Sequence, residues 1–194
     1  MTAPIIRRRG RGARDRGASM VEAAIVTPVV FAMIFGIIEL GMLFKDYLAT
    51  QAMVRAGVRI ASASPRTTDY AQATVNEVQR KAAVMDPTLI QQLWVYKANA
   101  ANDFPSGRSD FGDCATCVKF TWSAGTKSFV PVSSTWPATS QNACTPAAGG
   151  PPDRIGVYAR VSHPSMTGFV RSATIAEAAA ISLEPSPAPA GCKP

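Results

Sequence analysis

The hydrophobic pattern divides the chain into an apolar N-terminal stretch and a mixed remainder. Residues 21–44 read VEAAIVTPVVFAMIFGIIELGMLF and contain no Lys or Arg, and their two charged residues are Glu22 and Glu39. Twenty-four helical residues extend about 36 Å, which exceeds the bilayer hydrocarbon core of about 30 Å. Because a core helix of a soluble protein is seldom apolar on all sides over this length, the pattern predicts a membrane-spanning helix.

Three residues inside this stretch have consequences for a membrane helix. Pro28 removes one backbone donor and crowds the preceding turn, which predicts either a mild kink or a hinge. Ala32 and Gly36 form a small-xxx-small pair that permits two helices to pack closely. The stretch therefore has one candidate site for bending and one for helix packing.

The helical pattern continues beyond the apolar stretch. Residues 45–63 keep an apolar stripe, and Pro65 predicts that the helix ends before it. A second helix is predicted at residues 69–85, with Thr68 or Asp69 as its N-cap. The apolar stripe of this second helix consists of Ala71, Val75, Val78, Ala82 and Met85.

Strands are predicted in the C-terminal half of the chain. Residues 118–122 and 128–132 flank a Ser-Ala-Gly turn and predict a hairpin, while residues 93–97 and 155–161 predict two further strands. Residues 173–183 are ambiguous, because Ala favours a helix. We predict a strand there, since an antiparallel sheet needs a partner for residues 155–161. The fold class is therefore expected to be α+β.

The basic charge is concentrated before the apolar stretch. The chain has a net charge of +7 at pH 7, and residues 1–17 contain six Arg and one Asp. A nucleic-acid-binding face spreads its basic residues over a folded surface with aromatics nearby, so no nucleic-acid partner is expected. The positive-inside rule places residues 1–17 in the cytoplasm and residues 45–194 on the other side of the membrane.

Three processing signals are compatible with a basic N-terminus. A secretory signal needs small residues shortly after its apolar core, whereas the nearest Ala-Ser-Ala lies at 61–63. The arginine pair at 8–9 lacks the apolar residues that follow it in a twin-arginine signal. The third possibility is cleavage between Gly17 and Ala18, which makes Glu22 the fifth residue of the shortened chain.

This third pattern resembles the type IV prepilins. The stretch RGASMVEAAIVTPVVFAMIFGIIELGMLF is similar to TadE, the pseudopilin family of tight-adherence (Tad/Flp) pilus systems. The resemblance implies a pilin-like fold, in which a long N-terminal transmembrane helix continues into a small extracytoplasmic domain with a second helix and an antiparallel β-sheet. The implied divisions are a basic leader at 1–17, a helix at 18–63 with its membrane core at 21–44, an α+β domain at 64–184 and a Pro-rich tail at 185–194.

The resemblance also implies a role in pilus assembly without enzymatic activity. A prepilin peptidase would cleave between Gly17 and Ala18, unless Gly17 merely belongs to a flexible arm. Glu22 would pair with the new amino group of a neighbouring subunit and set its axial register, or would only reach the lipid headgroups. Glu39 is either solvated at the outer interface or in contact with a basic group on a partner's helix.

The implied location is the cytoplasmic (inner) membrane, crossed once, with the N-terminus in the cytoplasm and the C-terminal domain outside. The implied partners are the lipid bilayer, the prepilin peptidase, the major Flp-type pilin, other Tad pseudopilins and the inner-membrane assembly platform.

All four cysteines follow the apolar stretch: Cys114, Cys117, Cys144 and Cys192. An oxidising compartment favours structural disulfides. Four cysteines allow three pairings, and we favour a bond from Cys144 to Cys114 or Cys117, which would close the hairpin at 118–132.

Two other classes of protein compete with the pilin interpretation. One is a signal-anchored extracytoplasmic binding domain unrelated to pili. The other is a membrane-tethered thiol oxidoreductase that uses Cys114 and Cys117, although no helix is predicted to begin at this pair. A zinc site lacks a second close pair of ligands, and the single histidine, His163, is expected to be a loop residue. We therefore expect no metal, no cofactor and no catalytic site.

Overall fold

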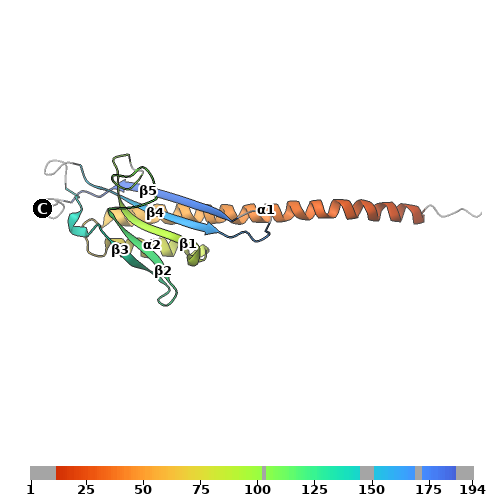
Figure 1. Cartoon of the computed structure of the whole chain (residues 1–194), viewed down its shortest axis with the longest axis horizontal. Helices are drawn as coiled ribbons and strands as arrows, with labels where there is room; N and C mark the ends of the chain where they lie inside the picture. The colour runs from red at the N-terminus through yellow and green to blue at the C-terminus, as the bar shows by residue number, and fades with distance from the viewer. Residues whose placement is uncertain (1–11, 102–103, 145–150, 169–171, 187–194) are drawn as a thin grey trace, which may run out of the picture.

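The computed structural model describes residues 12–101, 104–144, 151–168 and 172–186. Within these ranges, two α-helices and five strands form an α+β fold, as predicted (Figure 1). The elements are α1 (Gly12–Ala63), α2 (Tyr70–Lys81), β1 (Ile90–Ala98), β2 (Cys117–Ser123), β3 (Ser128–Ser134), β4 (Arg154–His163) and β5 (Ala173–Ser182), with short 3-10 helices η1 (Ala82–Val84), η2 (Pro87–Leu89) and η3 (Ala138–Ser140).

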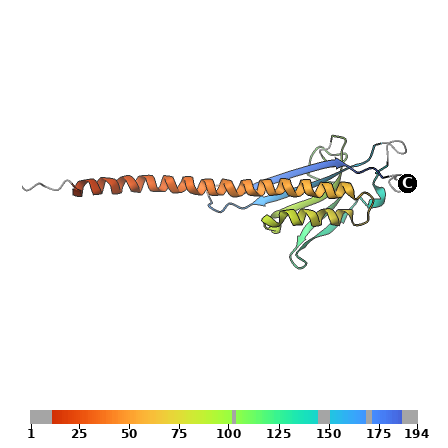
Figure 2. The same cartoon turned by 180° about the vertical axis from the view of Figure 1, so that it is seen from behind.

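Helix α1 is one continuous rod of 52 residues. It begins at Gly12, inside the predicted leader, where Arg and Ala favour a helix. It ends at Ala63, as Pro65 predicts. The helix passes through Pro28 without interruption and is drawn without a sharp bend (Figures 1 and 2). A functional hinge at Pro28 stays a prediction.

Helix α2 is shorter than the sequence pattern predicts. It spans Tyr70–Lys81, and the chain then tightens into the 3-10 helix Ala82–Val84. Asp69 occupies the N-cap position, but its side chain makes no capping hydrogen bond. The apolar stripe predicted for this helix is buried as expected, which shows that packing rather than capping holds α2 in place.

The five strands form one antiparallel sheet in the order β3-β2-β1-β4-β5. The predicted hairpin joins β2 and β3, with Ser123 opposite Ser128. Its register shifts next to Phe120, which lies opposite Pro131, a residue that has no N–H for the ladder. Strand β5 pairs with β4 over its whole length, so the strand predicted at 173–183 is confirmed. Pairing with a neighbour overrides the helix preference of alanine there.

Both helices cover the same face of the sheet, as the view from behind shows (Figure 2). The domain half of α1 packs against β4, β5 and α2, so it belongs to the core of the domain. A Cβ atom added to Gly57 of α1 would lie 2.6 Å from Cγ2 of Val78, so this glycine permits α1 and α2 to approach closely. Buried residues of this core include Met53, Val54, Val75, Leu93, Val95 and Val157.

An aromatic layer covers the opposite face of the sheet. Tyr96 of β1 and Tyr158 of β4 contact Phe111, whose ring stacks on Tyr158 with 4.1 Å between the ring centroids. Tyr96 lies opposite Gly156, and a Cβ atom added to that glycine would overlap the phenol ring. Phe111 and Cys114, which lie between β1 and β2, thus contribute to a second, smaller core on this face of the sheet.

Candidate functional site

The apolar segment of α1, residues 21–44, projects beyond the domain and is largely exposed (Figure 1). Soluble proteins rarely expose a contiguous apolar surface of this size, so lipid or other helices must cover it. Within the described part of the chain, α1 is the helix long and apolar enough to span a membrane. Its exposed side chains include Val21, Ile25, Phe31, Ile34, Phe35 and Leu40.

The predicted cleavage and register residues lie at the start of this helix. Gly17, Ala18 and Glu22 are all helical and exposed. A Cβ atom added to Gly17 would meet no atom within 4 Å, so the fold itself does not require a glycine there. The two residues of the cleavage site and the carboxylate of Glu22 are therefore accessible to other molecules. Cleavage and subunit register stay predictions.

The predicted helix-packing pair, Ala32 and Gly36, is also left uncovered by the rest of the described chain. Ala32 is exposed, Gly36 is partly exposed, and a Cβ atom on Gly36 would meet nothing within 4 Å. This face of α1 is thus free to contact another helix. That contact stays a prediction.

Glu39 makes contacts that the sequence did not predict. Its side chain is only 2% exposed, because residues 163–168, here called the strap, cross over it. The backbone N–H of Met166 donates to both carboxylate oxygens at 3.2 Å, and the N–H of Thr167 donates to Oε2 at 3.3 Å. Of the two alternatives for Glu39, solvation at the outer interface does not describe this structure, since the strap shields the carboxylate from water, and contact with a partner's helix stays a prediction. A contact with a partner's helix would have to compete with these hydrogen bonds.

A second carboxylate of α1 fixes the beginning of the strap. Nδ1 of His163 lies 2.7 Å from Oδ2 of Asp46, and both side chains are more than nine-tenths buried. The ammonium of Lys45 lies 3.2 Å from the other carboxylate oxygen of Asp46. Asp46 follows Glu39 by seven residues, which places the two carboxylates on the same side of the helix.

Sequence reasoning missed this pair of contacts. His163 ends strand β4 and is buried, rather than lying in a loop as expected. The partners are 117 residues apart, so no local pattern connects them. The available signal was the seven-residue spacing of Glu39 and Asp46 around the end of the apolar segment, which marks a side of α1 that needs polar partners.

The disulfide pairing differs from the favoured one. Cys114 is bonded to Cys117, and their Cα atoms are 6.1 Å apart. The preferred bond from Cys144 to one of these two residues is therefore wrong, because the turn before β2 already brings them together. Cys144 is also disulfide-bonded. Cys192 lies outside the described residues.

The surroundings of the Cys114–Cys117 bond favour a structural role. Both residues are buried in the aromatic layer, and Cys117 opens strand β2 rather than a helix. Thiol–disulfide exchange requires that an attacking thiolate reach one of the sulfurs. The burial of this pair therefore argues against a redox-active site. In the described ranges, no group of three or more His, Cys, Asp or Glu could hold a metal ion.

These features define a class of protein in which one candidate membrane helix continues into an α+β domain and packs into its core. Within that class, residues 17–59 match the family described as TadE-like protein. The match confirms the resemblance to TadE over this segment, which extends from the predicted cleavage site to the domain half of α1. Searches of curated proteins and of solved structures each found no significant match. The match over residues 17–59 and the length and apolarity of α1 are consistent with a single-pass membrane protein.

Proposed function

We propose that this chain is a TadE-like minor pilin or pseudopilin that takes part in assembly of a Tad/Flp pilus after a prepilin peptidase removes its leader. The observation that carries the proposal is the extent of the family match. It begins at Gly17, the residue before the predicted cleavage site, and it includes Glu22 and the whole exposed apolar segment. The match thus includes the part of the molecule that its own domain leaves uncovered.

The proposed topology places residues 1–17 in the cytoplasm and the domain outside the inner membrane. The six arginines of the leader support this orientation through the positive-inside rule. The disulfide Cys114–Cys117 supports it independently, because disulfides persist in oxidising compartments. Charge and redox chemistry therefore favour the same side of the membrane for the domain.

The proposed mechanism is mechanical. The apolar segment keeps the subunit in the bilayer and later packs among the helices of other pilins, where the Ala32 and Gly36 face permits a close approach. Glu22 then pairs with the amino group of a neighbouring subunit. An unpaired charge in apolar surroundings is costly, so a subunit in the wrong register is disfavoured. The pairing thereby selects the axial position of each subunit.

The proposed partners follow from this mechanism. They are the lipid bilayer, the prepilin peptidase, the major Flp-type pilin, other Tad pseudopilins and the inner-membrane assembly platform. The chain is a substrate of the peptidase and has no catalytic role of its own in this proposal. TadE-like proteins are structural pilus components, which supports that assignment.

Replacement of Glu22 tests the proposal. We expect Glu22→Leu to leave expression, membrane insertion and leader removal unchanged but to remove the protein from the assembled pilin fraction, because the carboxylate partner of the amino group is lost. The measurement is quantitative immunoblotting of membrane and assembled fractions.

The matched control is Glu177→Leu, which makes the same change on β5 of the domain and should assemble normally. If Glu22→Leu entered the assembled fraction as efficiently as the wild type and the control, the assembly role of Glu22 would be refuted.

A further inference from the structure

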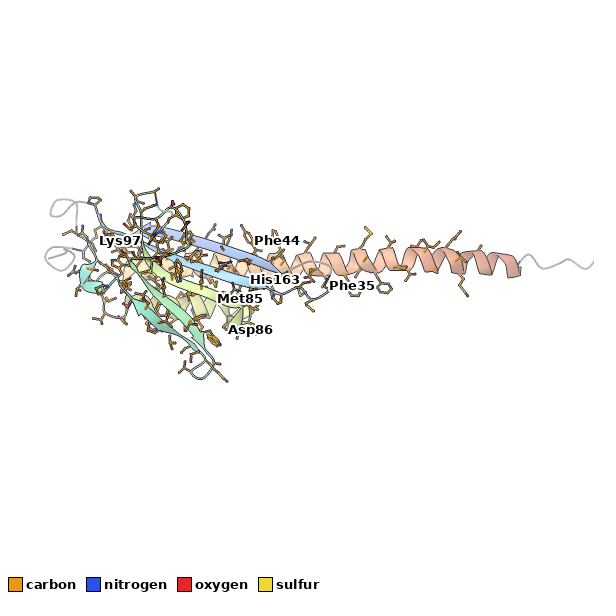
Figure 3. The ribbon with its side chains drawn as sticks, in the orientation of Figure 1. Phe35, Phe44, Met85, Asp86, Lys97 and His163 are labelled. Atoms are coloured by element: carbon orange, nitrogen blue, oxygen red, sulfur yellow. A yellow bond between two sulfur atoms is a disulfide. The ribbon has the colours of Figure 1, made fainter. Side chains whose placement is uncertain are left out.

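The strap extends from the end of β4 along α1 toward the apolar segment. Figure 3 shows the chain after His163 continuing beside the helix in the direction of Phe35, past the level of Phe44. The hydrogen bonds from Met166 and Thr167 to Glu39 fix this position. The strap is distant in sequence from α1, but it lies beside this helix at the end of the apolar segment.

The depth of the strap follows from helix geometry. Glu22 and Glu39 are separated by about 25 Å of helix, and Glu22 and Phe44 by about 33 Å. A hydrocarbon core of about 30 Å that begins at Glu22 therefore ends between Glu39 and Phe44. A tilted helix needs more residues to cross, which moves the boundary further toward Phe44. The strap backbone beside Glu39 thus lies at this boundary or slightly within it.

Hydrogen bonds at both ends hold the strap at this depth. Its first residue, His163, is bound to Asp46, and Glu39 accepts hydrogen bonds from two of its backbone N–H groups. The turn at its tip is closed by the N–H of Gly168, which donates to Oγ of Ser165 at 3.1 Å. Gly168 has a φ of +72°, a conformation that other residues rarely adopt. The strap also supplies Glu39 with backbone hydrogen-bond donors, which lipid hydrocarbon cannot provide.

Exposed apolar side chains lie on and around the strap. Met166 is 72% exposed, and Leu40 and Phe44 of α1 are also exposed. A cavity of about 480 Å³ between α1 and the start of β5 lies at the same end of the domain, and its lining is mostly apolar but includes Thr174 and Glu177. The side chain of Lys45 is about half exposed one residue beyond Phe44, where an ammonium suits lipid phosphates. Apolar surface thus continues from the helix onto the domain and ends at a basic residue.

We propose that the strap is a second membrane contact, whose tip at Met166 enters the headgroup–acyl boundary of the leaflet that faces the domain. The partner is the lipid surface itself. The inference rests on the proposed membrane crossing of α1 and goes beyond it. A single helix leaves the domain free to tilt and rotate on the bilayer, whereas a helix and a strap together fix its orientation. The domain is thereby presented to other subunits in one defined pose.

Site-specific fluorescence tests the proposal. The full chain carrying Met166→Cys is labelled with an environment-sensitive maleimide without reductant and reconstituted into phosphatidylcholine–phosphatidylglycerol vesicles. The label at 166 is expected to show blue-shifted emission, quenching by nitroxide-headgroup lipid and protection from aqueous iodide. Val132→Cys, which is similarly exposed but lies on the far edge strand β3, should be quenched by iodide and not by the lipid nitroxide.

Leu40→Cys separates failure of the strap contact from failure of the membrane crossing, because this position lies on α1 itself. If the labels at 40 and 166 are both exposed to iodide, the proposed membrane crossing of α1 is wrong, and the proposed strap contact, which depends on it, is wrong as well. If the label at 40 is quenched by lipid while the label at 166 behaves like that at 132, the strap contact alone is overturned. Protection of position 166 from iodide without quenching by lipid would show that a second protein surface covers the strap, which also overturns the proposal.

Discussion

Glycine at position 156 makes the aromatic layer possible. The register places Gly156 opposite Tyr96, and the phenol ring occupies the space where a Cβ atom would stand. The sequence pattern showed Gly156 only as a small residue at an alternating position of a strand. Its role depends on the partner residue across the sheet, which no local pattern identifies.

Gly156→Ala is expected to lower the free energy of unfolding by about 1–3 kcal/mol, the usual cost of overpacking. Denaturant unfolding of the full chain in detergent micelles measures this change. The matched control is Gly125→Ala, since a Cβ atom there would meet only Oγ of Ser123 at 3.9 Å. Equal losses in the two variants would contradict the proposed role of Gly156.

Tyr70 provides a prediction about pH. Its phenol donates to the carbonyl of Trp136 at 2.6 Å, and burial raises its pKa to about 12, against a smaller opposing effect of a hydrogen bond with Gln141. Below pH 10 the phenol is neutral in both the folded and the unfolded chain. Between pH 10 and 12 the unfolded chain loses this proton first, so the stability that Tyr70 contributes is lost as the pH rises, by about 2–3 kcal/mol in total.

Tyr70→Phe removes this ionisation and isolates its effect. We expect the variant to be less stable than the wild type by about 1 kcal/mol below pH 10, because the buried hydrogen bond is lost. The difference should shrink or reverse near pH 12, where the other ionising groups affect both proteins equally. If the free energies of unfolding of the two proteins differed by the same amount at every pH in this range, that result would be inconsistent with a buried Tyr70.

At the scale of elements, hydrophobic periodicity predicted most of the fold. A long stretch that is apolar on all sides identified the first half of α1. The period of a helix identified its second half and α2, and alternation with a turn identified β2, β3 and β4, because each of these elements buries one regular face. Strand β5 needed an additional argument about sheet pairing, since its alanines favour a helix. The start of α1 at Gly12, within the predicted leader, and the 3-10 ending of α2 were missed, because helix ends depend on contacts that the pattern does not contain.

The candidate site was predictable only where it is local. The Gly17–Ala18 junction, Glu22 and the apolar segment are contiguous in sequence, and the family match covers all of them. The strap contacts of Glu39 and Asp46 were not predictable, because they join segments more than 100 residues apart. The favoured disulfide was wrong for the opposite reason: the bond joins cysteines only three positions apart in a turn.

The contact between α1 and α2 gives a prediction at this scale. Gly57→Ala adds a methyl group 2.6 Å from Cγ2 of Val78, and the branched Val78 is fully buried and stiff. We expect a net loss of about 1 kcal/mol, because overpacking exceeds the gain in helix propensity of about 1 kcal/mol. Unfolding measurements on the single and double variants check this balance.

Val78→Ala supplies the background in which the clash is absent. In the Val78→Ala background, Gly57→Ala should stabilise the fold by about 1 kcal/mol, since only the higher helix propensity of alanine remains. The same loss from Gly57→Ala in both backgrounds would mean that Gly57 does not set the distance between the two helices.

At the scale of the whole molecule, helix α1 has one half that is exposed and apolar and another half that is buried in the domain. The apolar segment of α1 is uncovered, while the domain half of the same helix is part of a folded core (Figures 1 and 2). Any movement of the helix in or out of the bilayer is therefore transmitted directly to the domain. This continuity suits a subunit that is stored in a membrane and later transferred to an assembly.

Processing of the leader can be separated from folding by two matched variants. Gly17→Val should block peptidase cleavage, because it adds a branched side chain at the cleavage site, where the fold itself leaves open space. Gly41→Val makes the same change on the same helix, also into open space, and should be processed normally. Electrophoretic mobility after co-expression with a prepilin peptidase distinguishes the two forms. Normal cleavage of Gly17→Val would remove Gly17 from the proposed site.

The most direct test of the account is the intact mass of the wild-type chain extracted from membranes that contain a prepilin peptidase. The account predicts a membrane-bound species that lacks residues 1–17 and begins at Ala18. A full-length chain recovered from the soluble fraction, or a product that begins beyond the apolar segment, would contradict it.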